Sequence, residues 1–202
     1  MINSKYDILI AGVGGQGTVL ASRLIAAAAI KQGSFARTSE TIGMSQRGGC
    51  VVSHVRINSE NSGSIIPLNS ADMLIGFELA EVARNMQRLS KESCCIINTQ
   101  VIKPVSASLG TSQYDIEEIK KYINDNSKEI YFIDGYDITN KAGSVKAVNV
   151  VLLGAATAVG KMPFSKEVML EAIVENVPQK FRELNEKAFV MGYEYISAAL
   201  LG

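Results

Sequence analysis

The 202-residue chain has no tryptophan, one histidine and three cysteines, and these scarcities restrict the chemistry that it can hold. Cys50, Cys94 and Cys95 lack the C-x-x-C spacing of metal and redox sites. A structural metal or an iron–sulfur cluster needs about four clustered ligands, which three cysteines and one histidine at these positions do not supply. We therefore expect no metal centre on this chain, and reduced, apolar cysteines in a cytoplasmic protein.

The chain also lacks a charge bias and a long hydrophobic run. Lysine plus arginine and aspartate plus glutamate both number 20, so no net field attracts nucleic acid or an anionic membrane. The longest uncharged helical stretch, between Lys146 and Lys161, is too short for a membrane span, and Asn3, Lys5 and Asp7 interrupt the start where a signal peptide is apolar. We expect a soluble, cytoplasmic chain with neither nucleic acid nor membrane as a partner.

Short apolar segments alternate with amphipathic ones along the first two thirds of the chain, and the remainder is helical from Lys146 onward. No repeat or linker divides it. The alternation predicts a single domain, residues 1–202, with an α/β, Rossmann-like three-layer fold, a mostly parallel sheet and a helical C-terminal part. The predicted strands are 6–12, 35–40, 51–57, 72–77, 94–98 and 129–135, and the predicted helices are 16–32, 79–89 and 116–124.

The stretch "GVGGQG" follows the first predicted strand and opens the first predicted helix. Its G-x-G-x-x-G spacing allows a tight turn, a close backbone approach to a ligand, and an anion at the helix N-terminus. The second predicted strand carries Arg37 where a dinucleotide-binding domain has an acidic residue for the ribose, so an NAD(P) or flavin site is only one alternative. The candidate cofactor-binding residues in this turn are Gly12, Gly14, Gly15, Gln16 and Gly17.

A second glycine-bearing segment, "RTSETIGMSQRGGCVVSHVRI", leads into the strand at 51–57. Arg47 stands beside Gly48 and Gly49, and a guanidinium next to exposed glycine amides can clamp a phosphate or carboxylate. The simpler interpretation makes Arg47 a solvated loop charge, and pairs His54 and Arg56, on one face of the strand, with local carboxylates. Both interpretations stay open.

The C-terminal part contains a helix that is apolar on every side, with Asn149 as its only amide. We expect this amide in the core or at a subunit contact, bonded to backbone near the glycine turn, and we include Asn149 among the candidate binding residues. A final helix opens at Pro178. Its expected packing stripe consists of Phe181, Leu184, Ala188, Gly192, Tyr195 and Ala199.

Five segments together resemble the gamma-type subunit or domain of 2-oxoacid:ferredoxin oxidoreductases, and within that family its indolepyruvate members. They are "GVGGQG", "SETIGMSQRGGCVVSHVRI", "ADMLIGFELAEVAR", "NVVLLGA" and "NEKAFVMGYEY", which extend over nearly the whole chain. The spelling "MSQRGG" followed by "VVSHVR" is far more specific than the glycine turn. Members for pyruvate, 2-oxoglutarate and branched-chain acids share the same core, so the 2-oxoacid stays open.

The resemblance implies a complex that oxidatively decarboxylates a 2-oxoacid on thiamine diphosphate, reduces ferredoxin through iron–sulfur clusters and forms an acyl-CoA. This chain has neither the Gly-Asp-Gly signature of thiamine enzymes nor a cysteine ladder. The resemblance therefore places both cofactors on a catalytic partner subunit. It implies that this chain holds no catalytic residue and that the isolated chain is inactive. It also implies that the loop with Arg47 faces coenzyme A. A stand-alone nucleotide-binding Rossmann protein and a noncatalytic scaffold are the alternatives from other classes.

Overall fold

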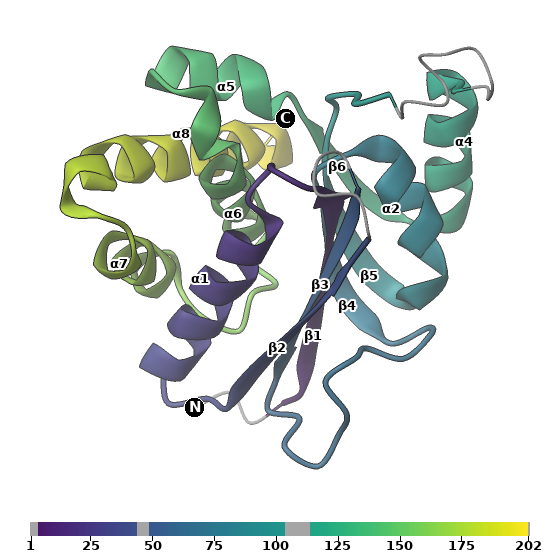
Figure 1. Ribbon diagram of the computed structural model, residues 1–202, viewed down its shortest axis with the longest axis horizontal. Helices are drawn as coiled ribbons and strands as arrows, with labels where there is room; N and C mark the ends of the chain where they lie inside the picture. The colour runs from purple at the N-terminus through teal and green to yellow at the C-terminus, as the bar shows by residue number, and fades with distance from the viewer. Residues whose placement is uncertain (1–3, 44–48, 104–113, 202) are drawn as a thin grey trace.

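The computed structural model describes residues 4–43, 49–103 and 114–201, and its described strands form one sheet in the order β2-β3-β1-β4-β5-β6 (Figure 1). β1 pairs in parallel with β4, β4 with β5 and β5 with β6, whereas β3 is antiparallel to both of its neighbours, β1 and β2. The predicted mostly parallel sheet is confirmed. The strands are β1 (Tyr6–Val13), β2 (Ala36–Ile42), β3 (Cys50–Ile57), β4 (Ala71–Gly76), β5 (Leu89–Asn98) and β6 (Glu129–Ile133).

Helices cover both faces of the sheet, which confirms the three-layer prediction: α1 and α5 to α8 lie on one side, and α2 and α4 on the other (Figure 1). The helix predicted over 79–89 ends early, because the chain tightens into a 3₁₀ turn and Leu89 already pairs with Ala71 as β5 begins. The helices are α1 (Thr18–Lys31), α2 (Leu79–Asn85), α4 (Ile116–Asn126), α5 (Gly135–Ala142), α6 (Val148–Ala158), α7 (Lys166–Asn176) and α8 (Arg182–Leu201), and the 3₁₀ turns are η1 (Met86–Arg88), η2 (Val145–Ala147) and η3 (Gln179–Phe181).

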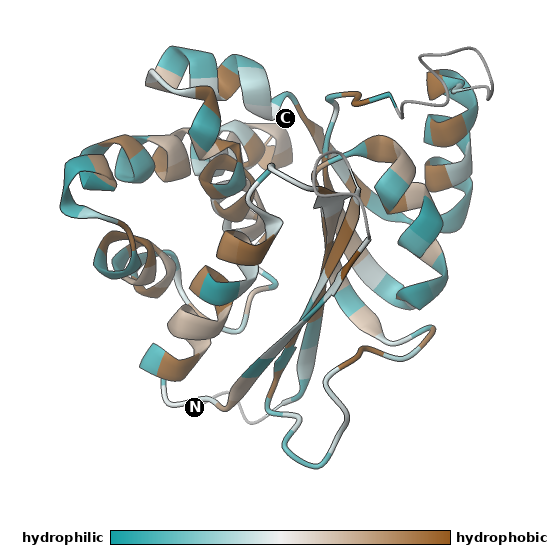
Figure 2. Ribbon diagram, in the orientation of Figure 1, coloured by the Kyte–Doolittle hydropathy of each residue, from teal (hydrophilic) through white to brown (hydrophobic). Residues whose placement is uncertain are grey.

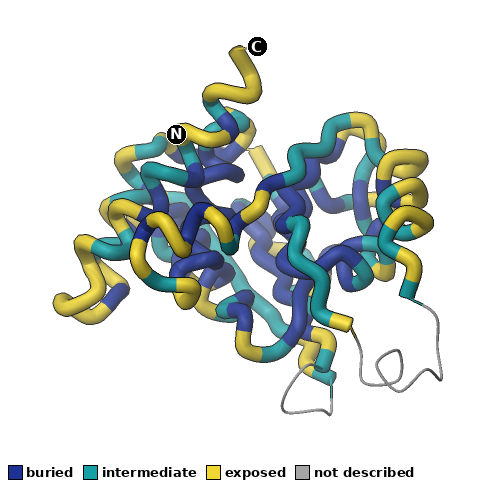
Figure 3. Tube along the Cα trace, turned by 90° about the horizontal axis from the view of Figure 1, so that it is seen from above, coloured by how far each residue is buried: buried dark blue, intermediate teal, exposed yellow. Residues whose placement is uncertain are grey.

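The core lies in two apolar layers on either side of the sheet, and β1 contributes to both. Successive side chains of a strand point to opposite faces. Ile8 and Ile10 accordingly pack in the layer under α1, α6 and α8, while Leu9 packs in the layer under α2 and α4. The hydropathy colouring shows brown segments in the strands between the helices, and the view from above shows much of the same interior as buried (Figures 2 and 3).

The final helix packs more narrowly than its sequence stripe predicts. α8 lies against α6, and its buried residues are Ala188, Phe189, Gly192 and Ile196. Ala188 and Gly192 were predicted, whereas Phe181, Tyr195 and Ala199 are exposed, which corrects the stripe. The reason is the close crossing with α6, because a Cβ at Gly192 would lie 2.1 Å from the carbonyl oxygen of Val151, and only the side of α8 around that glycine meets the core.

The cysteines agree with the expectation at two of three positions. All three are free, and Cys94 and Cys95 are buried in β5, where burial raises the pKa of their thiols to about 12 and about 11. Cys50 is exposed at the start of β3, so its assignment as apolar filler was wrong. Within the described residues no group of His, Cys, Asp and Glu side chains could hold a metal ion, and none of the helices is long and apolar enough to span a membrane.

Arg56 on β3 forms a buried ion pair, as in the interpretation that paired His54 and Arg56 with local carboxylates. Arg56 Nε and Nη2 donate to Asp7 Oδ1 and Oδ2 of neighbouring β1, each at 3.0 Å, and both side chains are buried. His54 differs from the expectation, since its Nδ1 accepts a hydrogen bond from the backbone N–H of Ile66 at 3.2 Å. Arg56 thus follows the carboxylate interpretation, whereas His54 binds the backbone of the loop before β4.

His54 should make the protein sensitive to acid. Burial, with Arg88 and Arg56 nearby, lowers the pKa of His54 to about 4, against about 6.5 in an unfolded chain. As the pH falls, His54 is therefore protonated in the unfolded chain at a higher pH than in the folded chain. The stability that is present above about pH 6.5 is lost as the pH falls towards the pKa of His54 in the folded chain, about 4. In urea titrations, His54→Gln should lose less stability than the wild type between about pH 7 and pH 4, by up to about 3 kcal/mol. Parallel stability curves would contradict this assignment.

Candidate functional site at the glycine turn

The turn between β1 and α1 is braced from within by Gln16. The side-chain Oε1 of Gln16 accepts from Val13 N–H at 2.9 Å, and its Nε2 donates to the carbonyl of Phe77 at 3.0 Å. Gly12 is enclosed, since a Cβ there would lie 2.7 Å from the Phe77 Cβ and 2.8 Å from Gln16 Oε1. Gly12 and Gln16 therefore fix the shape of the turn rather than facing its outer surface.

A second side-chain amide at the same sheet edge, Asn98, was not predicted from the sequence. Asn98 is fully buried at the end of β5, donates to the Phe77 carbonyl at 3.2 Å and accepts from Gly135 N–H at 3.0 Å. The ends of β4, β5 and β6 are thereby tied to the glycine turn. An asparagine that closes an apolar strand, as in "CCIIN", is the signal that could have identified it. Glu78 also serves this edge, as the cap that accepts from Glu81 N–H at 3.1 Å and as the acceptor for Tyr114 Oη.

The structure brings the two glycine-bearing segments together. Gly14 N–H donates to the carbonyl of Gly49 at 2.9 Å. Gly15 and Gly17 have positive φ of 97° and 85°, a backbone region that favours glycine. Among the described residues, no acceptor is bonded to the N–H groups of Gly15 or Gly17, and Gly15 is exposed. The turn thus has free backbone donors beside the N-terminus of α1. Arg47 and Gly48 lie outside the described residues.

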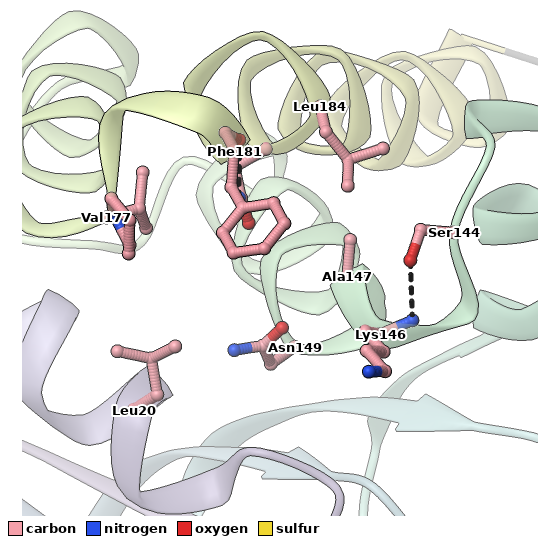
Figure 4. Close-up of a pocket in the computed structure, with 10 residues that line it drawn as sticks. Leu20, Ser144, Lys146, Ala147, Asn149, Val177, Phe181 and Leu184 are labelled. Carbon is pink, nitrogen blue, oxygen red and sulfur yellow. Dashed lines mark hydrogen bonds between the residues drawn. The ribbon is translucent and has the colours of Figure 1, made fainter.

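Asn149 lies on the other side of the turn, but not as expected. Its side chain is 3% exposed and contacts the turn, because a Cβ at Gly17 would lie 3.0 Å from Asn149 Nδ2. The amide makes no hydrogen bond to the described residues, so the expected bond to backbone near the glycine turn is corrected. Asn149 instead lines a surface pocket of about 170 Å³ (Figure 4). Because this helix is apolar on every side, its sequence does not indicate which way Asn149 points.

The sheet order bears on the dinucleotide alternative. In the dinucleotide-binding fold the second strand lies beside the first, and its end carries the residue that binds the ribose. Here the antiparallel β3 separates β2 from β1, so Arg37 is two strands away from the turn. Arg37 is also engaged elsewhere, since its Nη1 donates to the carbonyl of Ser62 at 2.7 Å. This geometry disfavours the ribose arrangement of NAD(P) enzymes.

The same architecture occurs in solved oxidoreductase subunits. The gamma subunit of a keto/oxoacid ferredoxin oxidoreductase from Geobacter sulfurreducens superimposes with a TM-score of 0.71 at 27% identity, covering 96% of this chain and 99% of that one. The 2-oxoglutarate:ferredoxin oxidoreductase from Magnetococcus marinus, solved with 2-oxoglutarate, coenzyme A and succinyl-CoA bound, has the same fold in part, with a TM-score of 0.69 at 19% identity over 96% of this chain and 31% of that chain. The fold therefore defines the class of oxoacid oxidoreductase gamma subunits.

Sequence comparison identifies the family. The sequence profile of the pyruvate ferredoxin/flavodoxin oxidoreductase family matches residues 7–195, and the chain belongs to that family. The indolepyruvate oxidoreductase subunit IorB of Archaeoglobus fulgidus is 40% identical over 190 residues, which is 94% of each chain. IorB of Pyrococcus horikoshii is 39% identical over 191 residues, covering 93% of this chain and 94% of the relative. The chain is thus a subunit of a 2-oxoacid:ferredoxin oxidoreductase.

Proposed function

We propose that the chain is the small subunit of a thiamine diphosphate-dependent indolepyruvate (arylpyruvate) ferredoxin oxidoreductase. The complex would convert a 2-oxoacid and coenzyme A to an acyl-CoA and CO₂, with the electrons passing to ferredoxin. The identity of 35–40% to four IorB subunits carries the choice of 2-oxoacid, since the pyruvate and 2-oxoglutarate synthase relatives compared with this chain are 24–29% identical to it.

Thiamine diphosphate and the iron–sulfur clusters belong, in this proposal, on the catalytic partner subunit. The cysteine positions support this for the clusters, because Cys94 and Cys95 are buried on opposite faces of β5 and Cys50 is on β3. An iron–sulfur cluster usually takes four clustered thiolates, more than this arrangement offers. When bound, the cofactors supply the decarboxylation and electron transfer, and this chain contributes binding surface.

Coenzyme A is the ligand that we assign to the turn. The free N–H groups of Gly15 and Gly17, the adjacent Gly49 and the N-terminus of α1 suit a phosphate, which accepts hydrogen bonds from such donors. Arg47 and Gly48 directly precede Gly49 in the sequence, and Arg47 would add a guanidinium clamp. Gly12, Gly14 and Gln16 would hold the shape of the cradle, and Asn149 would support Gly17.

Replacing Arg47 by alanine in the assembled complex tests this assignment. A charged hydrogen bond is worth about 1.5–3 kcal/mol, so the KM for coenzyme A should rise about ten- to a hundredfold. Release of CO₂ from the 2-oxoacid without coenzyme A should stay within about twofold, because that step does not use the phosphate. Arg23→Ala, which removes an exposed arginine from α1, is the matched control and should leave the KM unchanged.

The two readouts separate the alternatives for Arg47. A parallel fall in CO₂ release and coenzyme A use would assign Arg47 to the subunit interface. An unchanged KM would make it a solvated loop charge and would remove it from the proposed coenzyme A site.

A further inference from the structure

The pocket beside Asn149 has apolar walls that are exposed to solvent. It lies between α1, the start of α6 and the turn into α8, with Leu20 and Phe181 on opposite sides of the Asn149 amide (Figure 4). Leu20 is 40% exposed and Phe181 is 44% exposed. Large apolar side chains gathered around a surface pocket mark a place where another molecule binds.

The Asn149 amide provides an independent observation. It is almost fully buried, aims into the pocket and has no hydrogen-bond partner among the described residues. Its polar atoms are not among the fully enclosed ones that lack a partner, so the amide is accessible from the pocket and can bind an occupant there. A side-chain amide offers donors and an acceptor, which together match a peptide group.

One lysine lines the pocket, and a second lies next to a lining residue in the chain. Lys146 lines the pocket and Lys180 precedes Phe181, with its Nζ 4.9 Å from the centre of the Phe181 ring. Both lysines are exposed, and neither forms an ion pair with a described residue. An occupant with a carboxylate next to its apolar group therefore complements these lysines.

We propose that this pocket anchors a segment of the catalytic partner subunit. The segment inserts one leucine- or phenylalanine-sized side chain between Leu20 and Phe181, pairs its peptide group with Asn149, and places an acidic residue beside Lys146 and Lys180. Such a buried apolar anchor in a small pocket is where interfaces concentrate their binding energy. This inference rests on the proposed function, which supplies the partner.

The test measures the Kd between this chain and the separately purified large subunit by biolayer interferometry. Leu20→Ser should raise the Kd about ten- to a hundredfold, and Ile30→Ser, on the same helix and 59% exposed, should change it less than about twofold. Asn149→Leu, of similar size but without the amide, should raise the Kd at least about fivefold. The Lys146→Glu/Lys180→Glu variant should lose more affinity at low than at high salt. Circular dichroism checks that each variant is folded.

Each outcome separates this inference from the proposed function. If the wild-type chain binds the large subunit and Leu20→Ser binds equally well, the anchor is wrong and the proposed function stands. If Leu20→Ser changes only the KM for coenzyme A, the pocket holds a ligand rather than a subunit, and the anchor is again wrong. If the wild-type chain binds no large subunit, the proposed function itself fails.

Discussion

Replacing Asp7 by alanine is expected to lower the free energy of unfolding by about 3–5 kcal/mol. Asp7 is fully buried and Arg56 is 3% exposed, and they are joined by two hydrogen bonds of 3.0 Å between β1 and β3. Without the carboxylate, the Arg56 guanidinium stays buried, and its remaining acceptors among the described residues are the carbonyls of Gly63 and Ile65. The cost arises from this uncompensated charge rather than from the value of the ion pair.

Urea unfolding followed by circular dichroism measures this effect. Asp7→Ala combined with Arg56→Leu should recover much of the loss, because the second change removes the buried charge. Asp137→Ala breaks the exposed pair with Lys141 on α5 and should have a far smaller effect. A midpoint for Asp7→Ala near that of Asp137→Ala would contradict the structure of the sheet around Arg56.

Gly192→Leu is expected to destabilise the chain by about 3 kcal/mol or more, because α8 and α6 approach each other through their glycines. A Cβ at Gly192 would lie 2.1 Å from the Val151 carbonyl oxygen, and a Cβ at Gly154 would lie 2.1 Å from that of Phe189. The obstacles are backbone atoms, which cannot rotate away, so the helices would have to separate. Leucine favours helices more than glycine does, so propensity alone predicts the opposite sign.

The matched control for Gly192→Leu is Ala198→Leu, on the exposed side of the same helix. It adds a similar side chain without meeting α6 and should leave the thermal midpoint nearly unchanged. Equal midpoints for Gly192→Leu and the wild type would show that the two helices are not packed as described.

The sequence predicted the strands well because they are short apolar segments bounded by polar residues, as in β1 and β6. It did not predict that β3 lies between β1 and β2, because pairing direction depends on contacts between distant residues such as Asp7 and Arg56. The stripe of α8 failed for a similar reason. Apolar residues lie on several sides of the second half of that helix, and the crossing with α6 selects the side that is buried.

The candidate site was predictable where local rules apply. A glycine turn between a strand and a helix can be identified by its spacing, and its neighbour Gly49 by the second glycine segment. The brace between Gln16 and Phe77 joins residues 61 positions apart, and the link from Asn98 to Gly135 spans 37 positions. Hydrogen bonds between residues so far apart in the sequence depend on the order of the strands in the sheet, which the sequence did not predict. The direction of the Asn149 amide likewise depends on how α6 packs against α1 and α8.

The central claim is that this chain acts only as part of a complex, and reconstitution tests it most directly. The purified chain and its separately purified large subunit are assayed, alone and mixed, for reduction of ferredoxin by indolepyruvate in the presence of coenzyme A. The account predicts no turnover by this chain alone, and acyl-CoA formation with ferredoxin reduction by the mixture. Turnover by the isolated chain, or a mixture no more active than the large subunit alone, would contradict it.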